Sequence, residues 1–169
     1  MMFKRKLQGK TNYKKRLQFI ISNQPRLVIR KSNKLVYVQV IKYEQDGDKT
    51  IASASTKELL KLGYKGSVKS IPSSYLLGLL IANKAKEKSI SELVPDLGFH
   101  SPVKGSIPFA LISGVKDAGI NIKIDASVRP LDDRVSGKHI IEQLKKTQKI
   151  DPDEFSMSFE QAKRKLTEK

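Results

Sequence analysis

Hydrophobic and polar positions in the first third of the chain alternate with the period of β-strands. Three segments rich in β-branched or small residues show this pattern, at residues 26–31, 34–43 and 50–55. Ser32 and Asn33 separate the first two segments and predict a tight hairpin in which Asn33 adopts a positive φ. Residues 44–49 include Asp-Gly and predict a turn before the third strand. The pattern therefore predicts a three-stranded antiparallel meander.

The second of these strands has two different faces. One side carries only valines, namely Val36, Val38 and Val40. The other side carries Leu35, Tyr37, Gln39 and Ile41. Because residues two apart in a strand point the same way, the valines are expected to cover the core. Tyr37 and Gln39 are then expected to point outward.

From residue 56 onward the apolar spacing changes to that of helices. Three helices are predicted, over residues 57–62, 75–88 and 106–118. Thr56 is expected to cap the first helix, the Pro72-Ser73-Ser74 segment to open the second, and Pro108 to lie in the first turn of the third.

Two further strands are expected around the third helix, over residues 92–97 and 120–124. Pro95 has no backbone N–H, which favours an edge position for the first of them. After residue 125 the apolar density falls. There Ser136 and Ser158 are expected to cap two last helices, joined through Asp151-Pro152.

These elements predict an α/β fold with a mixed sheet, in which strand-helix units follow the meander. Three parts are expected: a basic arm with a short helix (1–22), an α/β core (23–125) and a helical C-terminal extension (126–169).

The charge is unevenly distributed along the chain. Lys and Arg number 33 against 17 Asp and Glu, a net charge of +16. Residues 1–43 hold 12 of the basic residues and no acidic one. A block of one sign is typical of an arm that binds a polyanion, so contact with nucleic acid is favoured over a merely solvated tail.

Composition excludes several other classes of function. The chain has no cysteine and two histidines, which excludes disulfides, thiolate zinc sites and cysteine nucleophiles. The longest apolar stretch, residues 75–82, is far short of the roughly 20 residues of a membrane span. A soluble intracellular protein without a metal or cofactor is expected, and neither a membrane partner nor a homo-oligomer.

The arm mixes cations with groups that can meet bases. Its candidate RNA contacts are Lys4, Arg5, Lys6, Lys10, Thr11, Asn12, Tyr13, Lys14, Lys15 and Arg16. Thr11 or Asn12 is expected to cap a helix over residues 13–22. Tyr13 either stacks on a base or packs against this helix, and the sequence favours both equally.

Two glycine-containing loops carry lysines ahead of helices. Lys65 and Lys69 lie in the loop over residues 63–70, and Lys104 precedes Gly105-Ser106. Exposed backbone N–H groups beside lysines can bind the phosphate groups of RNA, although many solvated loops have the same composition.

Catalysis is not expected from this sequence. The candidate groups are Asp96, His100, Asp117 and Asp125, and no nucleophile elbow, Walker A or dinucleotide motif is present. Asp96 is better explained as a carboxylate that stabilises a turn, and His100 as a side chain that bonds to RNA or backbone.

The ordered motifs of the chain resemble one family. They are G-K-T-N-Y (9–13), P-R-L-V-I-R-K-S-N-K (25–34), Y-V-Q-V-I (37–41), A-S-A-S-T-K-E-L (52–59), P-S-S-Y-L-L-G-L-L (72–80), D-L-G-F-H-S-P-V-K-G-S (96–106), F-A-L-I-S-G-V-K-D-A-G (109–119) and G-K-H-I (137–140). In this order and spacing they resemble the 5S-rRNA-binding proteins of the large ribosomal subunit, number eighteen of the universal series, in the archaeal form. The residues after Asp151 are the least matched.

The resemblance implies a structural component of the cytoplasmic ribosome that is not an enzyme. Such a protein binds 5S rRNA, anchors it to the large-subunit rRNA in the central protuberance, and lies beside another 5S-binding ribosomal protein, number five. It also implies a ribonuclease-H-like sheet topology without that superfamily's catalytic carboxylates. The implied RNA contacts are the arm and, around the first hairpin, Arg30, Lys31, Ser32, Asn33, Lys34, Tyr37 and Gln39.

Three alternatives remain open at this point. A protein of the membrane surface would need a basic amphipathic helix with bulky apolar residues, and residues 13–22 offer only a short apolar stripe. A metal-dependent RNA nuclease of ribonuclease-H-like fold would cleave RNA, and a general RNA chaperone would bind unrelated RNAs as tightly as 5S rRNA.

Overall fold

A computed structural model describes residues 3–9, 11–147 and 152–167 of the chain. Its centre is a five-stranded sheet in the order β3-β2-β1-β4-β5. The strands are β1 (Arg26–Lys31), β2 (Val36–Glu44), β3 (Gly47–Ser55), β4 (Glu92–Asp96) and β5 (Asn121–Ile122). β1, β2 and β3 are antiparallel neighbours, whereas β4 runs parallel to both β1 and β5. The predicted meander and the mixed sheet are confirmed.

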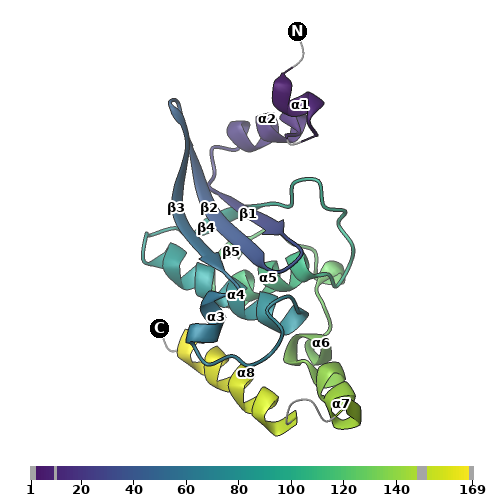
Figure 1. Cartoon of the computed structure of the whole chain (residues 1–169). Helices are drawn as coiled ribbons and strands as arrows, with labels where there is room; N and C mark the ends of the chain where they lie inside the picture. The colour runs from purple at the N-terminus through teal and green to yellow at the C-terminus, as the bar shows by residue number, and fades with distance from the viewer. Residues whose placement is uncertain (1–2, 10, 148–151, 168–169) are drawn as a thin grey trace.

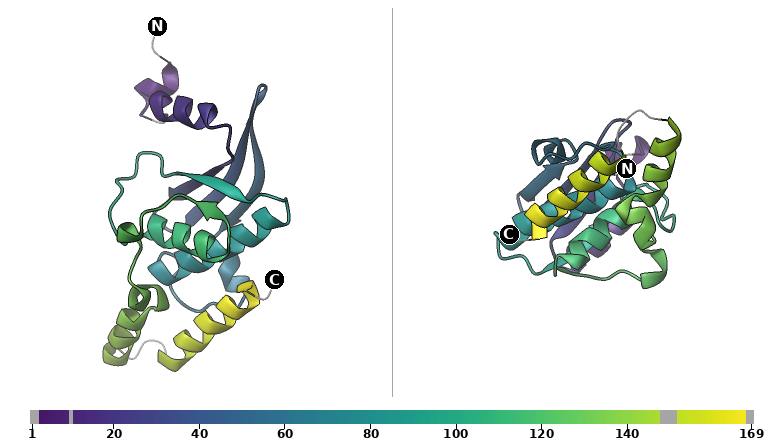
Figure 2. Two further views of the ribbon diagram at one scale, coloured as in Figure 1. Left: turned by 180° about the vertical axis from the view of Figure 1, so that it is seen from behind. Right: turned by 90° about the horizontal axis from the view of Figure 1, so that it is seen from below.

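Helices cover one face of this sheet (Figures 1 and 2). The two central ones are α4 (Ile71–Lys86) and α5 (Ile107–Asp117), and α8 (Pro152–Thr167) packs on the outside of α4. Val36, Val38 and Val40 are fully buried beneath these helices together with Leu27 and Ile29. The predicted valine face of β2 is therefore confirmed as the core face.

The remaining helices lie at the two ends of the molecule (Figure 1). At one end are α1 (Lys4–Leu7) and α2 (Tyr13–Ile21). At the other end are α3 (Glu58–Lys61), α6 (Asp132–Ser136) and α7 (Lys138–Thr147), and a 3₁₀ turn, η1 (Ala126–Val128), precedes α6. Among the described residues, the opposite face of the sheet carries a helix only where α2 lies against the start of β1 (Figure 1).

The hairpin between β1 and β2 is longer than predicted. Lys31 pairs with Val36, which leaves a four-residue loop over 32–35 instead of the two-residue turn. Ser32 N–H donates to the Leu35 carbonyl at 2.9 Å, and Leu35 N–H donates to Ser32 Oγ at 2.9 Å. These bonds close the loop without a left-handed residue. The prediction of a positive φ at Asn33 is wrong, because the described non-glycine residues with positive φ are Asn23 and Ser89.

The second hairpin extends farther than the apolar pattern predicts. β2 continues to Glu44 and β3 begins at Gly47, so the turn contains only Gln45 and Asp46. The added pairs, which include Tyr43 with Asp48, lie beyond the core and need no apolar alternation. A register irregularity between Val40 and Ile41 adjusts the pairing as the ribbon leaves the core.

Pro95 lies on an interior strand and not on an edge. Val94 N–H donates to the Pro25 carbonyl on the β1 side at 3.0 Å, so the nitrogen of Pro95 faces the β5 side. β5 is so short that it pairs only with Glu92 and Leu93. The missing N–H of Pro95 therefore removes no bond from the sheet.

Two expected helix starts differ in the first half of the chain. Thr56 does not cap α3: its buried hydroxyl instead accepts from Val36 N–H at 3.2 Å and ties β3 to β2. α4 begins at Ile71, four residues earlier than predicted, because Ser70 and Ser73 form a reciprocal capping box.

The C-terminal helices also start elsewhere than predicted. Gly137, in the left-handed conformation, ends α6 and separates it from α7, so Ser136 caps neither helix. Pro152 is the first residue of α8, and Ser158 is buried within that helix. The division of the chain into three parts stays a prediction.

Candidate RNA-binding surface

The basic arm folds into two short helices joined by side-chain contacts. Asn12 caps α2 by accepting from Lys15 N–H at 3.2 Å, whereas Thr11 Oγ1 accepts from Arg5 Nε at 3.0 Å. Tyr13 stacks on Phe3 with ring centroids 4.7 Å apart. One face of the Tyr13 ring is therefore in use within the arm. The outward cations are Lys4, Arg5, Lys6, Lys14 and Lys15, whereas Lys10 lies outside the described residues.

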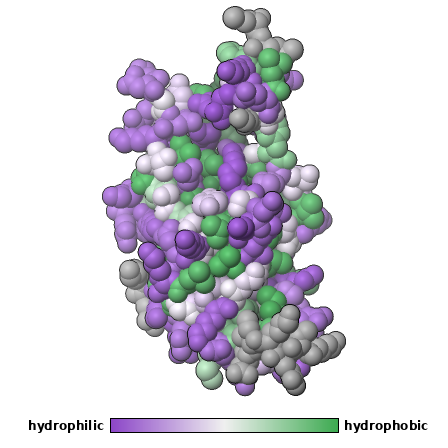
Figure 3. Space-filling model, viewed as in Figure 1, coloured by the Kyte–Doolittle hydropathy of each residue, from purple (hydrophilic) through white to green (hydrophobic). Residues whose placement is uncertain are grey.

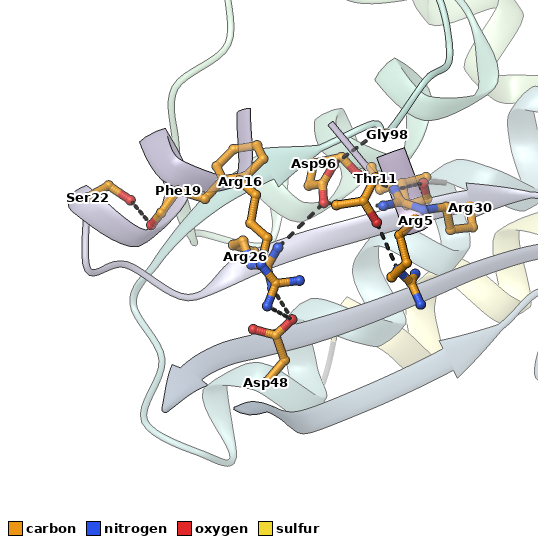
Figure 4. Close-up of polar contacts among 11 residues, drawn as sticks. Arg5, Thr11, Arg16, Phe19, Ser22, Arg26, Arg30, Asp48, Asp96 and Gly98 are labelled. Atoms are coloured by element: carbon orange, nitrogen blue, oxygen red, sulfur yellow. Dashed lines mark hydrogen bonds and ion pairs between the residues drawn. The ribbon is translucent and has the colours of Figure 1, made fainter. Parts of the chain in front are cut away.

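Asp48 and Arg26 fasten the arm to the sheet. Arg16 of α2 and Arg26 of β1 both contact Asp48 Oδ2, at 3.2 and 2.9 Å. The guanidinium of Arg26 also lies 5.9 Å from the ring centroid of Phe19 in α2. Figure 4 shows these side chains converging from α2, β1 and β3.

Asp96, at the end of β4, continues this arrangement. Its carboxylate lies 3.8 Å from Arg26 and 3.2 Å from Arg30. Its other oxygen accepts from Gly98 N–H at 2.8 Å, which confirms the interpretation of Asp96 as a turn-stabilising carboxylate. Three guanidinium groups thus alternate with two carboxylates in one row, which we call the arginine row (Arg16, Asp48, Arg26, Asp96, Arg30).

The arginine row fixes cations beside an open cavity. A cavity of about 220 Å³ is bordered by the row and by residues of the arm, among them Arg5 and Lys15. The carboxylates orient the guanidinium groups and leave one net positive charge in the row. Hydrophilic side chains gather over this end of the molecule, on the arm and at the tip of the β2–β3 hairpin (Figure 3).

The helix-free face of the sheet connects the arm to the first hairpin loop. Gln39 lies opposite Val28, and Tyr37 lies opposite Arg30, across β1 and β2. Tyr37 is 45% exposed and Gln39 is exposed, as predicted. At the far end of β1 the loop exposes Lys31, Ser32, Asn33 and Lys34.

One of the two glycine loops adds a cation to this surface. Lys69 Nζ donates to the Asn33 carbonyl at 3.0 Å, which places Lys69 beside the hairpin loop. Lys65 pairs instead with Glu154 at the start of α8. At the start of α4 the Ser70 side chain accepts from Ser73 N–H, so this N–H already has a partner within the protein.

Lys104 and His100 occupy the long loop after β4. His100 N–H donates to the Leu97 carbonyl at 3.3 Å, in a turn beside Arg30. Lys104 lies farther along the loop and acts on Asp125. The pKa of Asp125 is lowered mainly by hydrogen bonds from Ser127 and to a lesser extent by the charge of Lys104. The structure thus groups His100 with Arg30, and places Lys104 and Lys65 elsewhere.

The other candidate catalytic carboxylates each have separate structural partners. Asp117 accepts from Tyr75 Oη at 3.0 Å and from Arg129 Nη2 at 2.6 Å. Burial, followed by the charge of Asp117, raises the pKa of Tyr75 to about 12. Asp125 caps η1 by accepting from Ser127 N–H at 2.9 Å. Within the described ranges no group of three or more His, Cys, Asp or Glu side chains is placed to hold a metal ion.

Sequence reasoning missed the arginine row. Arg26 and Arg30 lie four apart on one strand, which puts them on one face, and this spacing was a usable signal. The role of Asp48 had no such signal, because the residue sits in a turn-like polar segment. Its approach to Arg26 depends on the extended second hairpin and its irregular register.

Comparisons with known proteins agree with the resemblance found in the sequence. A family model for ribosomal large subunit proteins 60S L5 and 50S L18 matches residues 1–95, more than half of the chain. The chain is also 44% identical over 156 residues to the large ribosomal subunit protein uL18 of Thermofilum pendens, covering 92% of this chain and 80% of that protein. None of the helices in the described part of the chain is long and apolar enough to cross a membrane.

These matches confirm the family and the general function. The protein is a structural constituent of the large ribosomal subunit in the cytoplasm, and its partners are ribosomal RNA and the ribosome. With a family match across the arm and most of the sheet, and a relative aligned over nearly the whole length, the chain belongs to the family of ribosomal large subunit proteins 60S L5 and 50S L18.

Proposed function

We propose that this chain binds 5S rRNA through the arm, the arginine row and the first hairpin loop, and helps to anchor it to the large-subunit rRNA in the central protuberance. The observation that carries the proposal is one basic strip that runs along the helix-free side of the sheet as far as the first hairpin loop. It begins at α1 and α2, follows the arginine row, and ends at Lys31, Lys34 and Lys69. β1 alone contributes about 20 Å to its length at roughly 3.3 Å per residue.

The two parts of the strip support different contributions to binding. Lysines of the arm and the loop meet phosphates as point charges and release counterions, which supplies affinity with little preference for sequence. Tyr37, Gln39 and Asn33 are exposed beside these cations and can meet bases or 2′-hydroxyl groups. RNA shape and these contacts would supply the preference for 5S rRNA.

The arrangement of the strands supports a ribonuclease-H-like topology. The order β3-β2-β1-β4-β5, with β2 alone antiparallel to its neighbours, is the observation behind this assignment. We assign the chain no catalytic activity. The engagement of Asp96 by Arg26, Arg30 and Gly98 N–H supports a structural role for the carboxylate at the end of β4.

The proposal includes a protein neighbour, the 5S-binding ribosomal protein number five. This part of the proposal rests on the family resemblance, because the strip described above is assigned to RNA and not to a protein partner. Copurification from dissociated subunits tests this part: a particle containing 5S rRNA and both proteins is expected, and a particle lacking protein five would contradict it.

A binding titration tests the central claim. The protein is titrated against a 5S rRNA transcript and against an unrelated structured RNA of similar length, at two salt concentrations. Tighter binding to 5S rRNA at both salt concentrations is expected. Equal affinity for both RNAs would favour a general RNA chaperone, and magnesium-dependent cleavage of either RNA would favour a nuclease.

A further inference from the structure

Phe99 is a large aromatic side chain that the fold exposes on a fixed turn. It is 60% exposed, on the turn that follows β4. Asp96 Oδ1 accepts from Gly98 N–H at 2.8 Å, and His100 N–H donates to the Leu97 carbonyl at 3.3 Å. The turn is therefore bonded on both sides of Phe99, and the ring points away from the core.

Arg30 forms the floor beneath this turn. Its guanidinium donates to the carbonyls of Ile29 and Asp96 at 2.8 and 2.9 Å, and lies 3.2 Å from Asp96 Oδ2. Gly98 has a φ of +63°, and a Cβ built there would lie 3.0 Å from Arg30 Cζ. A glycine is thus needed for the turn to lie directly on the guanidinium. The Arg30 side chain nevertheless remains 47% exposed.

The turn and Arg30 line an open cavity next to the arm. A cavity of about 230 Å³ is lined by Arg30, Leu97, Gly98, Phe99 and His100. Phe99 and Arg30 also border the cavity of about 220 Å³ that Arg5 and Asn12 of the arm line. An RNA strand that follows the arm would therefore pass within reach of Phe99.

We propose that this cavity receives one unpaired base of ribosomal RNA, stacked on Phe99, with Arg30 and His100 as polar contacts at its edge. An aromatic ring accepts any base on its face, and a guanidinium and an imidazole can both hydrogen-bond to a base or a phosphate. The inference rests on the proposed function, which brings RNA to the arm. The base belongs either to 5S rRNA or to large-subunit rRNA, and both present the same chemistry.

Three variants of Phe99 separate stacking from apolar packing. Phe99→Ala is expected to weaken binding to the 5S rRNA transcript about tenfold, and Phe99→Leu nearly as much, because neither offers an aromatic face. Phe99→Tyr should retain binding. The slope of affinity against salt should stay unchanged in all three, since no charge is removed. Met157→Ala is the matched control, because Met157 is 61% exposed on α8, away from the strip.

Thermal melts of the same variants check the fold. Each should melt within the error of the parent protein, because Phe99 buries little surface. If Phe99→Ala lowers both the melting temperature and the affinity for RNA, and Phe99→Leu lowers neither, then Phe99 acts through apolar packing and the proposal is wrong.

Ultraviolet crosslinking of intact large subunits identifies the source of the base. A nucleotide adduct on Phe99 or His100 is expected, and the sequence of the attached RNA distinguishes 5S rRNA from large-subunit rRNA. Unchanged binding of Phe99→Ala to 5S rRNA together with an adduct to large-subunit rRNA supports a base from the latter. Adducts elsewhere on the protein, none on residues 97–100, and unaltered binding would overturn the proposal.

The same experiments keep the two proposals apart. Failure of the parent protein to prefer 5S rRNA contradicts the proposed function, and the crosslink in intact subunits still decides the base site. Normal 5S rRNA binding by Phe99→Ala without an adduct contradicts only the base site.

Discussion

Asp48 Oδ2 lies 2.9 Å from Arg26 Nη2. Asp48 is near the tip of the β2–β3 hairpin, whereas Arg26 is the first residue of β1. The Arg26 side chain is only 10% exposed, and Asp48 is its nearer carboxylate; Asp96 is 3.8 Å away. A guanidinium this far removed from water needs such a partner. The same oxygen also contacts Arg16, so one carboxylate holds both the strand and the arm.

Asp48→Ala is expected to destabilise the protein by about 1–3 kcal/mol, because it leaves a buried charged donor poorly paired. It should also accelerate amide hydrogen exchange in α2, through the loss of the Arg16 contact. Chemical unfolding and hydrogen exchange measure the two effects. Glu44→Ala on the same hairpin is the control, since the exposed Glu44–Lys49 pair at 3.7 Å should contribute less than about 1 kcal/mol. Equal losses in both variants would contradict the role of Asp48.

Deletion of residues 1–10 should leave the core folded and sharply weaken 5S rRNA binding. α1 buries none of its residues, and the deletion removes Lys4, Arg5, Lys6 and Lys10. A melting temperature close to the parent value and a shallower salt dependence of binding are expected. If the truncated protein keeps full affinity, the arm has no part in binding.

Lys34→Ala should weaken binding to 5S rRNA and to an unrelated structured RNA alike. The side chain is exposed in the loop over 32–35, where we propose that it contacts phosphate as a point charge. Titration of both RNAs at two salt concentrations checks this. A change confined to 5S rRNA would instead indicate a specific contact.

The two faces of β2 should behave differently when each is truncated. Tyr37→Ala and Gln39→Ala should lower the preference for 5S rRNA, and their melting temperatures should change little. Val38 is fully buried, so Val38→Ala should cost about 1–3 kcal/mol of stability and affect binding only through unfolding. Loss of RNA preference in Val38→Ala, with stability retained, would reverse this assignment.

Stability at alkaline pH should depend on Tyr75. The folded state holds its pKa at about 12, against 10.0 as the ordinary value. A raised pKa means that the unfolded chain loses this proton first, so the stabilisation is complete below pH 10 and is lost as the pH rises toward 12. Tyr75→Phe removes the titrating group. Between these pH values the free energy of unfolding should therefore fall more steeply with pH for the parent protein than for Tyr75→Phe. An equal fall in both proteins would refute this.

Much of the fold follows from local patterns that tertiary structure leaves unchanged. The valines of β2 alternate because one side of the strand is buried, and Pro72 and Pro108 lie in the first turns of α4 and α5, where a missing N–H costs nothing. One error arose where a distant partner decided the outcome. Thr56 was expected to cap a helix, but its hydroxyl instead accepts a hydrogen bond from the N–H of Val36, 20 residues away.

The candidate site was predictable in composition but not in arrangement. The lysines of the arm and the hairpin loop stand out as a block of one charge. The arginine row does not, since Asp48 and Asp96 lie 22 and 70 residues beyond Arg26 and meet it only after β3, β2, β1 and β4 are aligned. Phe99 also escaped notice, because an apolar residue next to a glycine gives no sign of whether it will be buried or displayed.

The packing of α8 has a consequence for the order of events during synthesis. Phe155 is 1% exposed and meets Tyr64 edge to face, with ring centroids 6.1 Å apart, and Phe159 and Leu166 are buried in the same cluster. These residues leave the ribosome exit tunnel long after the arm and the meander. While translation continues, the nascent chain therefore presents the strip proposed to bind RNA before the apolar outer side of α4 is covered. An RNA partner and chaperones can each reach the nascent chain in that interval, before the last helix docks.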